Sequence, residues 1–537
     1  MVLFFLFSLV VISQGSASSS SSSDYAGPFL NFIDAGENND KWNLSVLVVA
    51  SASTSEDDLT MDIWGGEKAI SPTLIDTIKG QQFWRYRLSF NRDDVPRKVT
   101  YQVGKSSAFT VTVPARKTDP YVLFGSCNKY DKPNSMWERI MGKQAEKPCH
   151  LALLAGDQIY NDDVLYCDRI AQILTSDPYQ EIDETTAFEV EEEATNFTLN
   201  NYLTHYSKPG WREFLASVPN KSLADNHEFF KGKGSYERFL PVMEIVSRVA
   251  DRFYMLFQHH VTKEKAFETG LIGVSVGDAL LSYNYLLKFN TMAFYGLDTR
   301  TERTSNQVAS LPSRKFMFDK LGSLNQKNIF LITGLPLVYQ NLTAFYKISK
   351  LVDYFPTLKS FIFNLLGETK TLGKLPIIVE YVDQWAYAGH VEERNDLITK
   401  LNTLVYDGKK VTLLAGDPHA AALGEVVDKG TGQTRIQQIN SSAITTAPLG
   451  KPYIALKKVL GFFQGLFWGK ESYGSALSQR LTDYTHMESG KKSSEVPDNN
   501  FTMLGVKDEV AYATLWTLNQ ASSQLEPWSL QGWPQKF

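Results

Sequence analysis

The stretch LALLAGDQIY, residues 151–160, decides how the chain folds. Its first half is wholly apolar, which is typical of a strand buried on both faces of a sheet, and it stops abruptly at Gly156 and Asp157. Four other segments share this form, a short apolar run that ends in a polar cluster. They are Tyr121–Phe124 before Gly125–Asn128, Leu223–Ala224 before Asp225–Glu228, Phe294–Leu297 before Asp298–Arg300, and Val411–Ala415 before Gly416–His419. Ligands collect beyond the carboxyl ends of such strands, so we expect the five clusters to meet in one crevice.

The clusters supply metal ligands of three chemical kinds. Oxygen comes from Asp157, Tyr160, Asn226 and Asp417, nitrogen from His227 and His419, and sulfur from Cys127. A shared carboxylate can bridge two cations about 3.5–4 Å apart, which clamp a phosphate and activate a water. A thiolate with a phenolate suits a strongly Lewis-acidic iron, whereas a position rich in Asp and Asn suits calcium, magnesium or manganese. The clusters therefore predict a site of two or three metals that hydrolyses a phosphate ester.

Residues 42–114 show a different pattern, in which apolar and polar side chains alternate. The segment WRYRLS at 84–89 is an example. A period of two predicts strands with one buried face. We therefore expect an N-terminal β-sandwich over residues 28–116, which is the usual scale for that fold, and a catalytic domain over residues 119–537.

Taken in order, the polar motifs resemble those of the alkaline phosphatase D family, PhoD-like metallophosphatases of the calcineurin-like metallophosphoesterase superfamily. The matching motifs are Gly125-Ser126-Cys127, Gly156-Asp157-x-x-Tyr160, the block 225–228, Leu297–Arg300, Asp383-x-Trp385 and Gly416-Asp417-x-His419. The resemblance covers most of the chain. It implies an N-terminal β-sandwich followed by an α/β metallophosphoesterase domain, in which two packed mixed sheets are flanked by helices.

The resemblance also implies a role for each motif residue. Cys127, Asp157, Tyr160 and His419 would hold a ferric ion, and Asp157, Asn226 and Asp417 would hold calcium. Another divalent pair, from zinc, manganese and magnesium, is the alternative. His227 would be a general acid or a hydrogen-bond donor to the leaving group. Arg300 would contact the phosphate as a two-pronged donor, unless it pairs with a neighbouring acid such as Asp298 or Glu302.

The expected activity is hydrolysis of phosphate monoesters or diesters through attack by a metal-bound hydroxide. The alternative is a non-catalytic secreted module that binds metal or a phosphate ligand on the same scaffold. The substrate would be a small-molecule or lipid phosphate ester. The chain has 54 Lys and Arg against 59 Asp and Glu, a net charge of −5, so we expect no specific nucleic-acid binding.

The first residues resemble a secretory signal. Residues 2–12 are almost wholly apolar and are followed by the small residues Gly15, Ser16 and Ala17. We expect a signal peptide over 1–17, a serine-rich spacer over 18–27, and a secreted or otherwise extracytoplasmic protein.

Residues 454–468, IALKKVLGFFQGLFW, are rich in aromatic and aliphatic side chains. One interpretation is a buried helix. The other is a lid or interfacial segment that makes peripheral contact with a membrane.

The chain has three cysteines, so at least one is unpaired. We expect that Cys149 and Cys167 do not pair. A strand over 150–155 would leave Cys149 at the end far from the loop that leads to Cys167.

Overall fold

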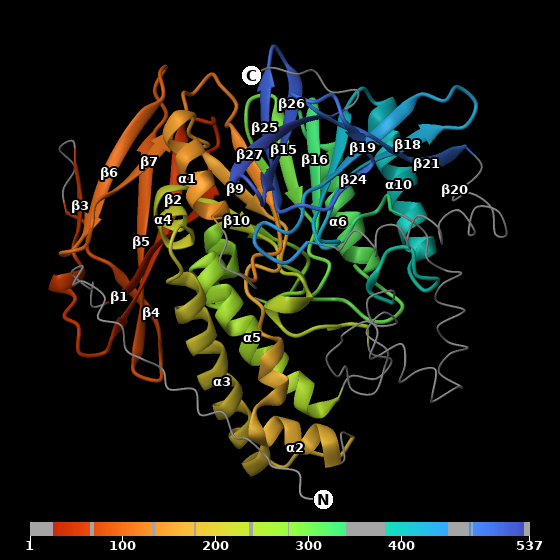
Figure 1. The fold of residues 1–537 in the computed structure, drawn as a ribbon. Helices are drawn as coiled ribbons and strands as arrows, with labels where there is room; N and C mark the ends of the chain where they lie inside the picture. The colour runs from red at the N-terminus through yellow and green to blue at the C-terminus, as the bar shows by residue number, and fades with distance from the viewer. Residues whose placement is uncertain are drawn as a thin grey trace, which may run out of the picture.

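The computed structural model describes residues 25–64, 69–130, 135–176, 179–235, 240–277, 279–339, 382–448, 472–473 and 476–530. The predicted signal peptide (1–17) and the 454–468 segment lie outside these residues. Strand β1 (Tyr25–Asp34) begins three residues before the predicted start of the N-terminal domain at Pro28. Figure 1 shows strands filling the upper part of the molecule and three helices, α2, α3 and α5, below them.

The first large sheet has 12 strands and joins the N-terminal, central and C-terminal parts of the chain. Its order is β23-β22-β27-β26-β25-β8-β9-β10-β1-β2-β5-β4. The central strands β8 (Val122–Gly125), β9 (Leu151–Leu154) and β10 (Asn220–Ser222) are parallel, so their carboxyl ends meet at one edge. The remaining strands are β2 (Lys41–Ser51), β4 (Thr73–Ile78), β5 (Gln81–Asn91), β22 (Tyr484–His486), β23 (Lys492–Ser493), β25 (Asn500–Lys507), β26 (Val510–Asn519) and β27 (Gln524–Leu530).

The second large sheet has 10 strands, in the order β11-β14-β15-β16-β17-β19-β18-β21-β20, with β24 paired to β18. Four of its strands are parallel: β15 (Met292–Gly296), β16 (Asn328–Thr333), β17 (Lys410–Ala415) and β19 (Thr434–Asn440). The others are β11 (Leu271–Ile272), β14 (Asn284–Lys288), β18 (Ala421–Asp428), β20 (Ser472–Tyr473), β21 (Leu477–Thr482) and β24 (Glu495–Val496). A two-stranded sheet pairs β12 (Ser275–Val276) with β13 (Ala279–Leu280).

Alternate side chains of the second sheet enter two different cores. Phe294, Phe330 and Leu414 belong to the large core that also contains the first sheet. Their neighbours Tyr295 and Leu331 pack in a second core with residues of α6 (Leu311–Gly322) and α10 (Val391–Tyr406). One face of this sheet therefore packs on the first sheet's core and the other is covered by helices, which explains why its strands are apolar throughout.

Five more helices are described: α1 (Met136–Glu146), α2 (Asp168–Ser176), α3 (Glu184–Tyr206), α4 (Trp211–Ser217) and α5 (Pro241–His259). Helix α3 begins where the Asp183 carboxylate accepts a hydrogen bond from the Thr186 amide, an N-cap. It packs on α5 through the stacked rings of Tyr202 and Phe257, whose centroids are 4.5 Å apart. No helix among the described residues is long and apolar enough to cross a membrane.

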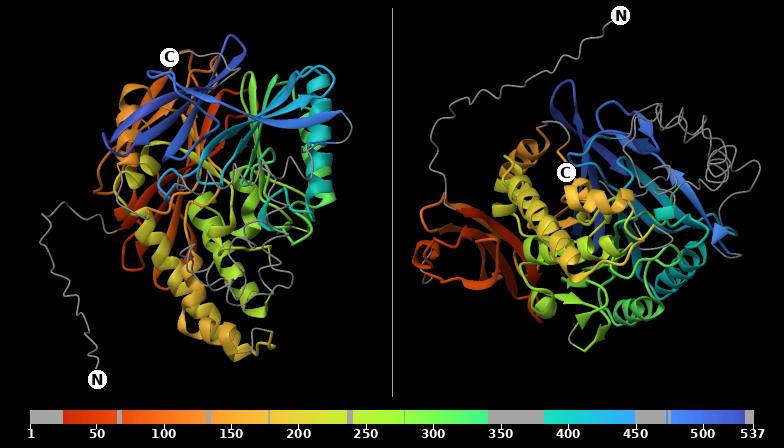
Figure 2. Two further views of the ribbon diagram at one scale, coloured as in Figure 1. Left: turned by 45° about the vertical axis from the view of Figure 1, so that its right-hand side comes forward. Right: turned by 90° about the horizontal axis from the view of Figure 1, so that it is seen from below.

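The predicted N-terminal strands form, but they do not make a clearly separate sandwich. Only β3 (Met61–Ile63), β6 (Arg97–Val103) and β7 (Phe109–Val113) form a sheet of their own. The other four strands extend the first large sheet, because β1 pairs with β10 at Asn31 and Asn220. Side chains strengthen this junction, since the Asn220 amide donates to the Leu30 carbonyl at 2.7 Å. Figure 2 shows the red N-terminal strands against the body of the molecule in two further views.

Candidate metal centre

The predicted ligands follow the carboxyl ends of parallel strands in both large sheets. Cys127 comes two residues after β8, Asp157 three residues after β9, and His419 four residues after β17. Their sulfur, oxygen and nitrogen atoms all lie within 4.8 Å of one another. These three clusters therefore converge as the sequence predicts, although they are far apart along the chain.

Tyr160 completes this group. Its hydroxyl lies 3.5 Å from Oδ2 of Asp157 and 3.3 Å from Nε2 of His419. Thr446 donates a hydrogen bond to the same hydroxyl at 3.2 Å. All four residues predicted to hold iron thus surround one point.

The backbone is strained at the ligands. Cys127, Asp157, Asp417 and His419 have positive φ angles of 61°, 56°, 68° and 48°. L-residues rarely adopt this region, and such strain gathers at functional sites. The turns after these strands therefore hold the four residues in a left-handed backbone conformation at an energetic cost.

Glu228 holds two of these turns together. Its buried carboxylate accepts hydrogen bonds from the backbone amides of Asp157 (2.9 Å), Gln158 (2.7 Å) and Asp225 (2.8 Å). Gly156, with φ of 97°, lets the turns approach, because a Cβ there would lie 2.3 Å from the Cβ of Asp225. The Asp157 loop and the Asn226 loop are thus fixed against each other.

Asn226 and Asp417 are the residues predicted to hold the second metal together with Asp157. Oδ1 of Asn226 is buried and accepts no hydrogen bond from the described residues. A buried polar atom without a partner is costly, and an amide oxygen is a ligand that calcium and similar cations prefer. The Asp417 carboxylate is held by Gln384, whose amide donates to Oδ2 at 3.0 Å.

The acidic groups of the site are buried together. Burial raises the pKa of Cys127 to about 11 and that of Asp417 to about 6, and it also raises the pKa values of Asp157 and Tyr160. Desolvation and the negative charge of acidic neighbours both disfavour the charged form of each group. A bound multivalent cation would compensate all four groups, so the donor set fits a metal centre.

His227 lies beside the ligands and is oriented by Asp162, a residue that the sequence analysis did not single out. Nδ1 of His227 is 2.7 and 2.8 Å from the two Asp162 oxygens, and its ring stacks on Tyr160 with centroids 4.1 Å apart. Burial alone would lower the pKa of His227, but the Asp162 and Asp157 carboxylates raise it to about 9. The two carboxylates therefore favour the protonated form of the imidazole.

The structure places Arg300, the predicted phosphate contact, among buried carboxylates. Its side chain is 0% exposed, and its guanidinium bonds to Asp225 and, through two bonds of 2.6 Å, to Asp383. Arg303 also pairs with Asp383. Neither acid that the sequence suggested as a partner, Asp298 or Glu302, makes the ion pair. Arg300 instead joins the chain segments that carry Asn226 and Gln384, neighbours of Asp225 and Asp383.

Further supporting residues escaped the sequence analysis. Ser442, after β19, donates to the Cys127 sulfur at 3.2 Å and accepts from the His419 amide at 3.1 Å. Gln384 lies inside the Asp383–Trp385 motif and so carried a signal. Asp162 stands two residues after Tyr160, so its position next to a motif was a weaker signal in the sequence. The short polar run around Ser442 gave no such signal.

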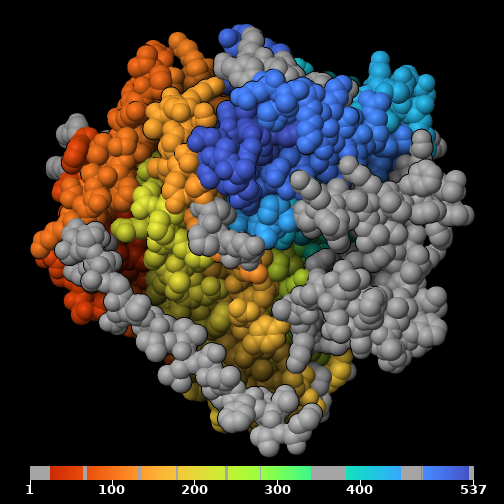
Figure 3. All heavy atoms as spheres, viewed as in Figure 1, coloured from red at the N-terminus to blue at the C-terminus, as the bar shows by residue number. Residues whose placement is uncertain are grey.

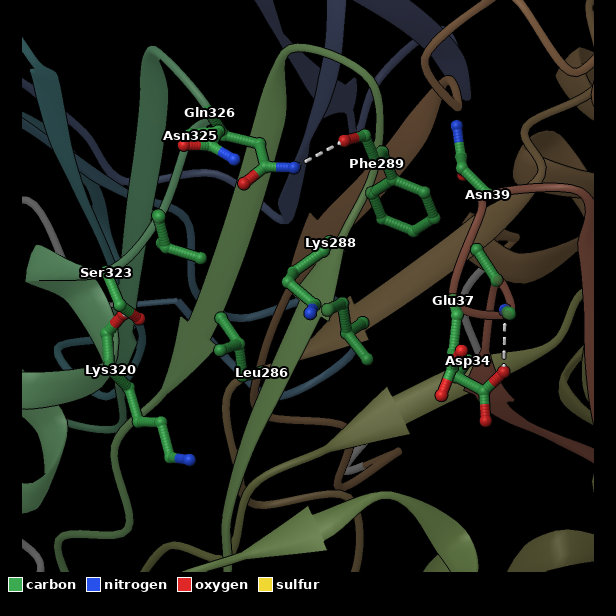
Figure 4. A pocket seen from close by; sticks show the side chains of 14 residues that line it. Asp34, Glu37, Asn39, Leu286, Lys288, Phe289, Lys320, Ser323, Asn325 and Gln326 are labelled. Atoms are coloured by element: carbon green, nitrogen blue, oxygen red, sulfur yellow. Dashed lines mark hydrogen bonds between the residues drawn. The ribbon is translucent and has the colours of Figure 1, made fainter.

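A polar cavity of about 410 Å³ lies elsewhere, between the β1–β2 loop and β14 (Figure 4). Asp34 and Glu37 line one side, and Lys288 and Lys320 line the other. None of the predicted site residues lines it. It is therefore separate from the metal centre.

Known proteins share sequence or fold with this chain. A family model of PhoD-related phosphatases matches residues 125–371. An uncharacterized protein of Saccharomyces cerevisiae, YGR266W, is 27% identical over 406 residues, which are 65% of this chain and 57% of that protein. The chain thus matches less than two thirds of this relative's length. The solved structure of PhoD is similar over 96% of this chain and 95% of its own, with a TM-score of 0.52 and 13% identity. The fold is that of PhoD.

Proposed function

We propose that this chain, which belongs to a PhoD-like family, is a metal-dependent phosphoesterase. One observation carries the proposal: Cys127, Asp157, Tyr160 and His419 surround a single point. A thiol, a carboxylate, a phenol and an imidazole buried together have no evident structural purpose, whereas they form a typical donor set for a transition metal.

The metals that fit best are a ferric ion and calcium. The iron would be held by Cys127, Asp157, Tyr160 and His419. The thiolate of Cys127 and the phenolate of Tyr160 favour iron over magnesium. Asp157, Asn226 and Asp417 would hold calcium, with zinc, manganese or magnesium as alternatives. The metals would supply positive charge for the phosphoryl oxygens and a water of lowered pKa.

The protein's own groups would do the rest. His227, protonated against Asp162, would donate its Nε2 proton to the oxygen of the departing alcohol. The Asp162 carboxylate fixes the plane of the ring and would keep the remaining proton on Nδ1 after the transfer, as an acid does in other histidine pairs. Glu228 and Arg300 would not contact the substrate. Both would instead hold in place the loops that carry the metal ligands.

The substrate of this proposal is a small-molecule or lipid phosphate ester, either a monoester or a diester. Secretion by the N-terminal signal remains part of the proposal, as does membrane contact through residues 454–468. The opposing possibility, a binding module without turnover, predicts bound metal but no hydrolysis.

The substitution Asp162→Asn tests the acid role of His227 and, with it, the function. Wild-type protein should hydrolyse at least one of two esters, p-nitrophenyl phosphate and bis-p-nitrophenyl phosphate. In Asp162→Asn we expect kcat to fall by about 10²–10⁴-fold for alkyl phosphates, which need a proton on the leaving alcohol. The fall should be much smaller for p-nitrophenyl esters, whose leaving group needs none. The measurement is kcat and KM for a leaving-group series.

The matched control is Asp163→Asn, which changes the exposed neighbour of Asp162 and should leave both rates unchanged. Equal losses for alkyl and p-nitrophenyl esters would contradict the acid role of His227. Wild-type protein that binds metal yet hydrolyses no phosphate ester would reject the enzyme and favour the binding module.

A further inference from the structure

A second cavity, of about 330 Å³, lies on the outer side of the first sheet, beside α1. Strands β8, β25 and β26 form its floor and the last turns of α1 form one wall. In Figure 3 the orange spheres of the α1 region lie beside the blue spheres of the C-terminal strands. Its volume is at the lower end of the range for small-molecule pockets, about 300–1,000 Å³.

The interior of this cavity is apolar. Leu123, Ile140 and Phe501 line it and are buried, and Trp516 adds an aromatic wall. Cys149 also lines it as a free thiol, and burial raises its pKa to about 12. Its polar neighbour Gln144 is fully engaged, because its amide donates to the Cys149 carbonyl and accepts from the Cys149 amide. The interior therefore favours an apolar group.

The mouth of the cavity carries one uncompensated positive charge. Lys143 forms an ion pair with Glu146 at 2.8 Å, whereas Lys147 forms no ion pair with any described residue. The Lys147 ammonium lies 4.3 Å from the ring centroid of Tyr121 and 5.9 Å from that of Tyr512. Burial lowers the pKa of Lys147, and no carboxylate offsets this. A net charge of one at the rim of an apolar cavity calls for a ligand with a single negative charge.

We propose that this cavity binds a small amphipathic carboxylate, with its hydrocarbon part inside and its head on Lys147. A phosphate dianion fits less well, because Glu146 stands at the same rim and no second free cation is described there. The cavity is separate from the metal centre, since Tyr121 precedes β8 while Cys127 follows its other end. The proposal does not depend on the proposed function.

Calorimetric titration of the full-length protein with decanoate, below its micelle concentration, tests the proposal. Wild-type protein should bind about one decanoate, and it should bind decanol and decylamine more weakly. Lys147→Gln should weaken decanoate at least about tenfold, the size expected for a charge-assisted hydrogen bond, and should leave decanol unchanged. The control Lys98→Gln, at an exposed position of β6, should have no effect.

A second variant fills the cavity. Thr514→Trp places a large ring in the pocket from β26 and should abolish binding of both decanoate and decanol, with folding checked by a thermal melt. Absence of decanoate binding to wild-type protein would overturn the proposal. So would a decanoate affinity that Lys147→Gln leaves unaltered, which can be read even if Thr514→Trp does not fold.

Discussion

Replacing Asp157 with Asn is expected to lower phosphate-ester turnover by about 10³-fold or more, comparable to or beyond the loss of one preorganised electrostatic group. Asp157 lies 3.5 Å from both the Cys127 sulfur and the Tyr160 hydroxyl, and its other oxygen accepts from the His227 amide at 3.2 Å. In the proposed centre Asp157 would be a ligand of both metals. An amide of the same shape keeps the packing but loses the charge that a bridging ligand needs.

The same variant separates catalysis from folding. Burial and the neighbouring acids Cys127, Asp225 and Glu228 disfavour the Asp157 anion more than His227 favours it, so its pKa is raised. The metal-free variant should therefore unfold at no lower temperature than the metal-free wild type. Asp58→Asn, at an exposed position, is the control for both readings. Turnover and metal content within a factor of a few of the wild type in Asp157→Asn would place the site elsewhere.

Replacing Arg300 with Ala is expected to lower the free energy of unfolding by about 3–5 kcal/mol, the usual cost of breaking a buried ion pair. The guanidinium, which is wholly buried, bonds to Asp225 and Asp383. Burial would lower the pKa of Arg300, but the two carboxylates raise it, and Arg300 with Arg303 lowers the pKa of Asp383 despite its burial. Without Arg300, two carboxylates would remain buried with too little positive charge.

Denaturant unfolding measures this loss, and Arg248→Ala is the matched control. Arg248 pairs with Glu191 at the surface at 2.9 Å, so its loss should cost no more than about 1 kcal/mol. Arg300→Lys keeps the charge but not the planar fork, and should recover only part of the stability. A stable Arg300→Ala protein with a raised KM would instead restore Arg300 as a phosphate contact.

Much of the candidate site could be predicted from the sequence because its signal is local. An apolar run that ends at Asp157 or Asp417 indicates both that a strand is buried and where the strand ends. Parallel pairing then brings such ends to one edge of each sheet. The structure adds that the backbone is left-handed at both residues. The sequence does not predict this conformation, because residues other than glycine rarely adopt it.

Other features depend on pairing across the fold, which no local pattern encodes. Alternation in the N-terminal strands predicts a buried face, but not that β1 would join β10 and extend the first large sheet. The partners of Arg300 lie 75 and 83 residues away in the chain, so the nearer acids were the natural but wrong choice. Asp162 was overlooked because its role depends on where the His227 ring lies.

The proposed iron-containing metal centre is tested by the metal content and visible absorption of the purified wild-type protein, compared with those of Tyr160→Phe. We expect bound iron with a second, divalent ion, and a charge-transfer band from the Tyr160 phenolate that disappears in Tyr160→Phe. Colourless protein that contains no iron, yet hydrolyses phosphate esters fully with zinc or manganese, would contradict the assignment of Cys127 and Tyr160 as iron ligands. Protein that binds no metal at all would contradict the metal centre itself.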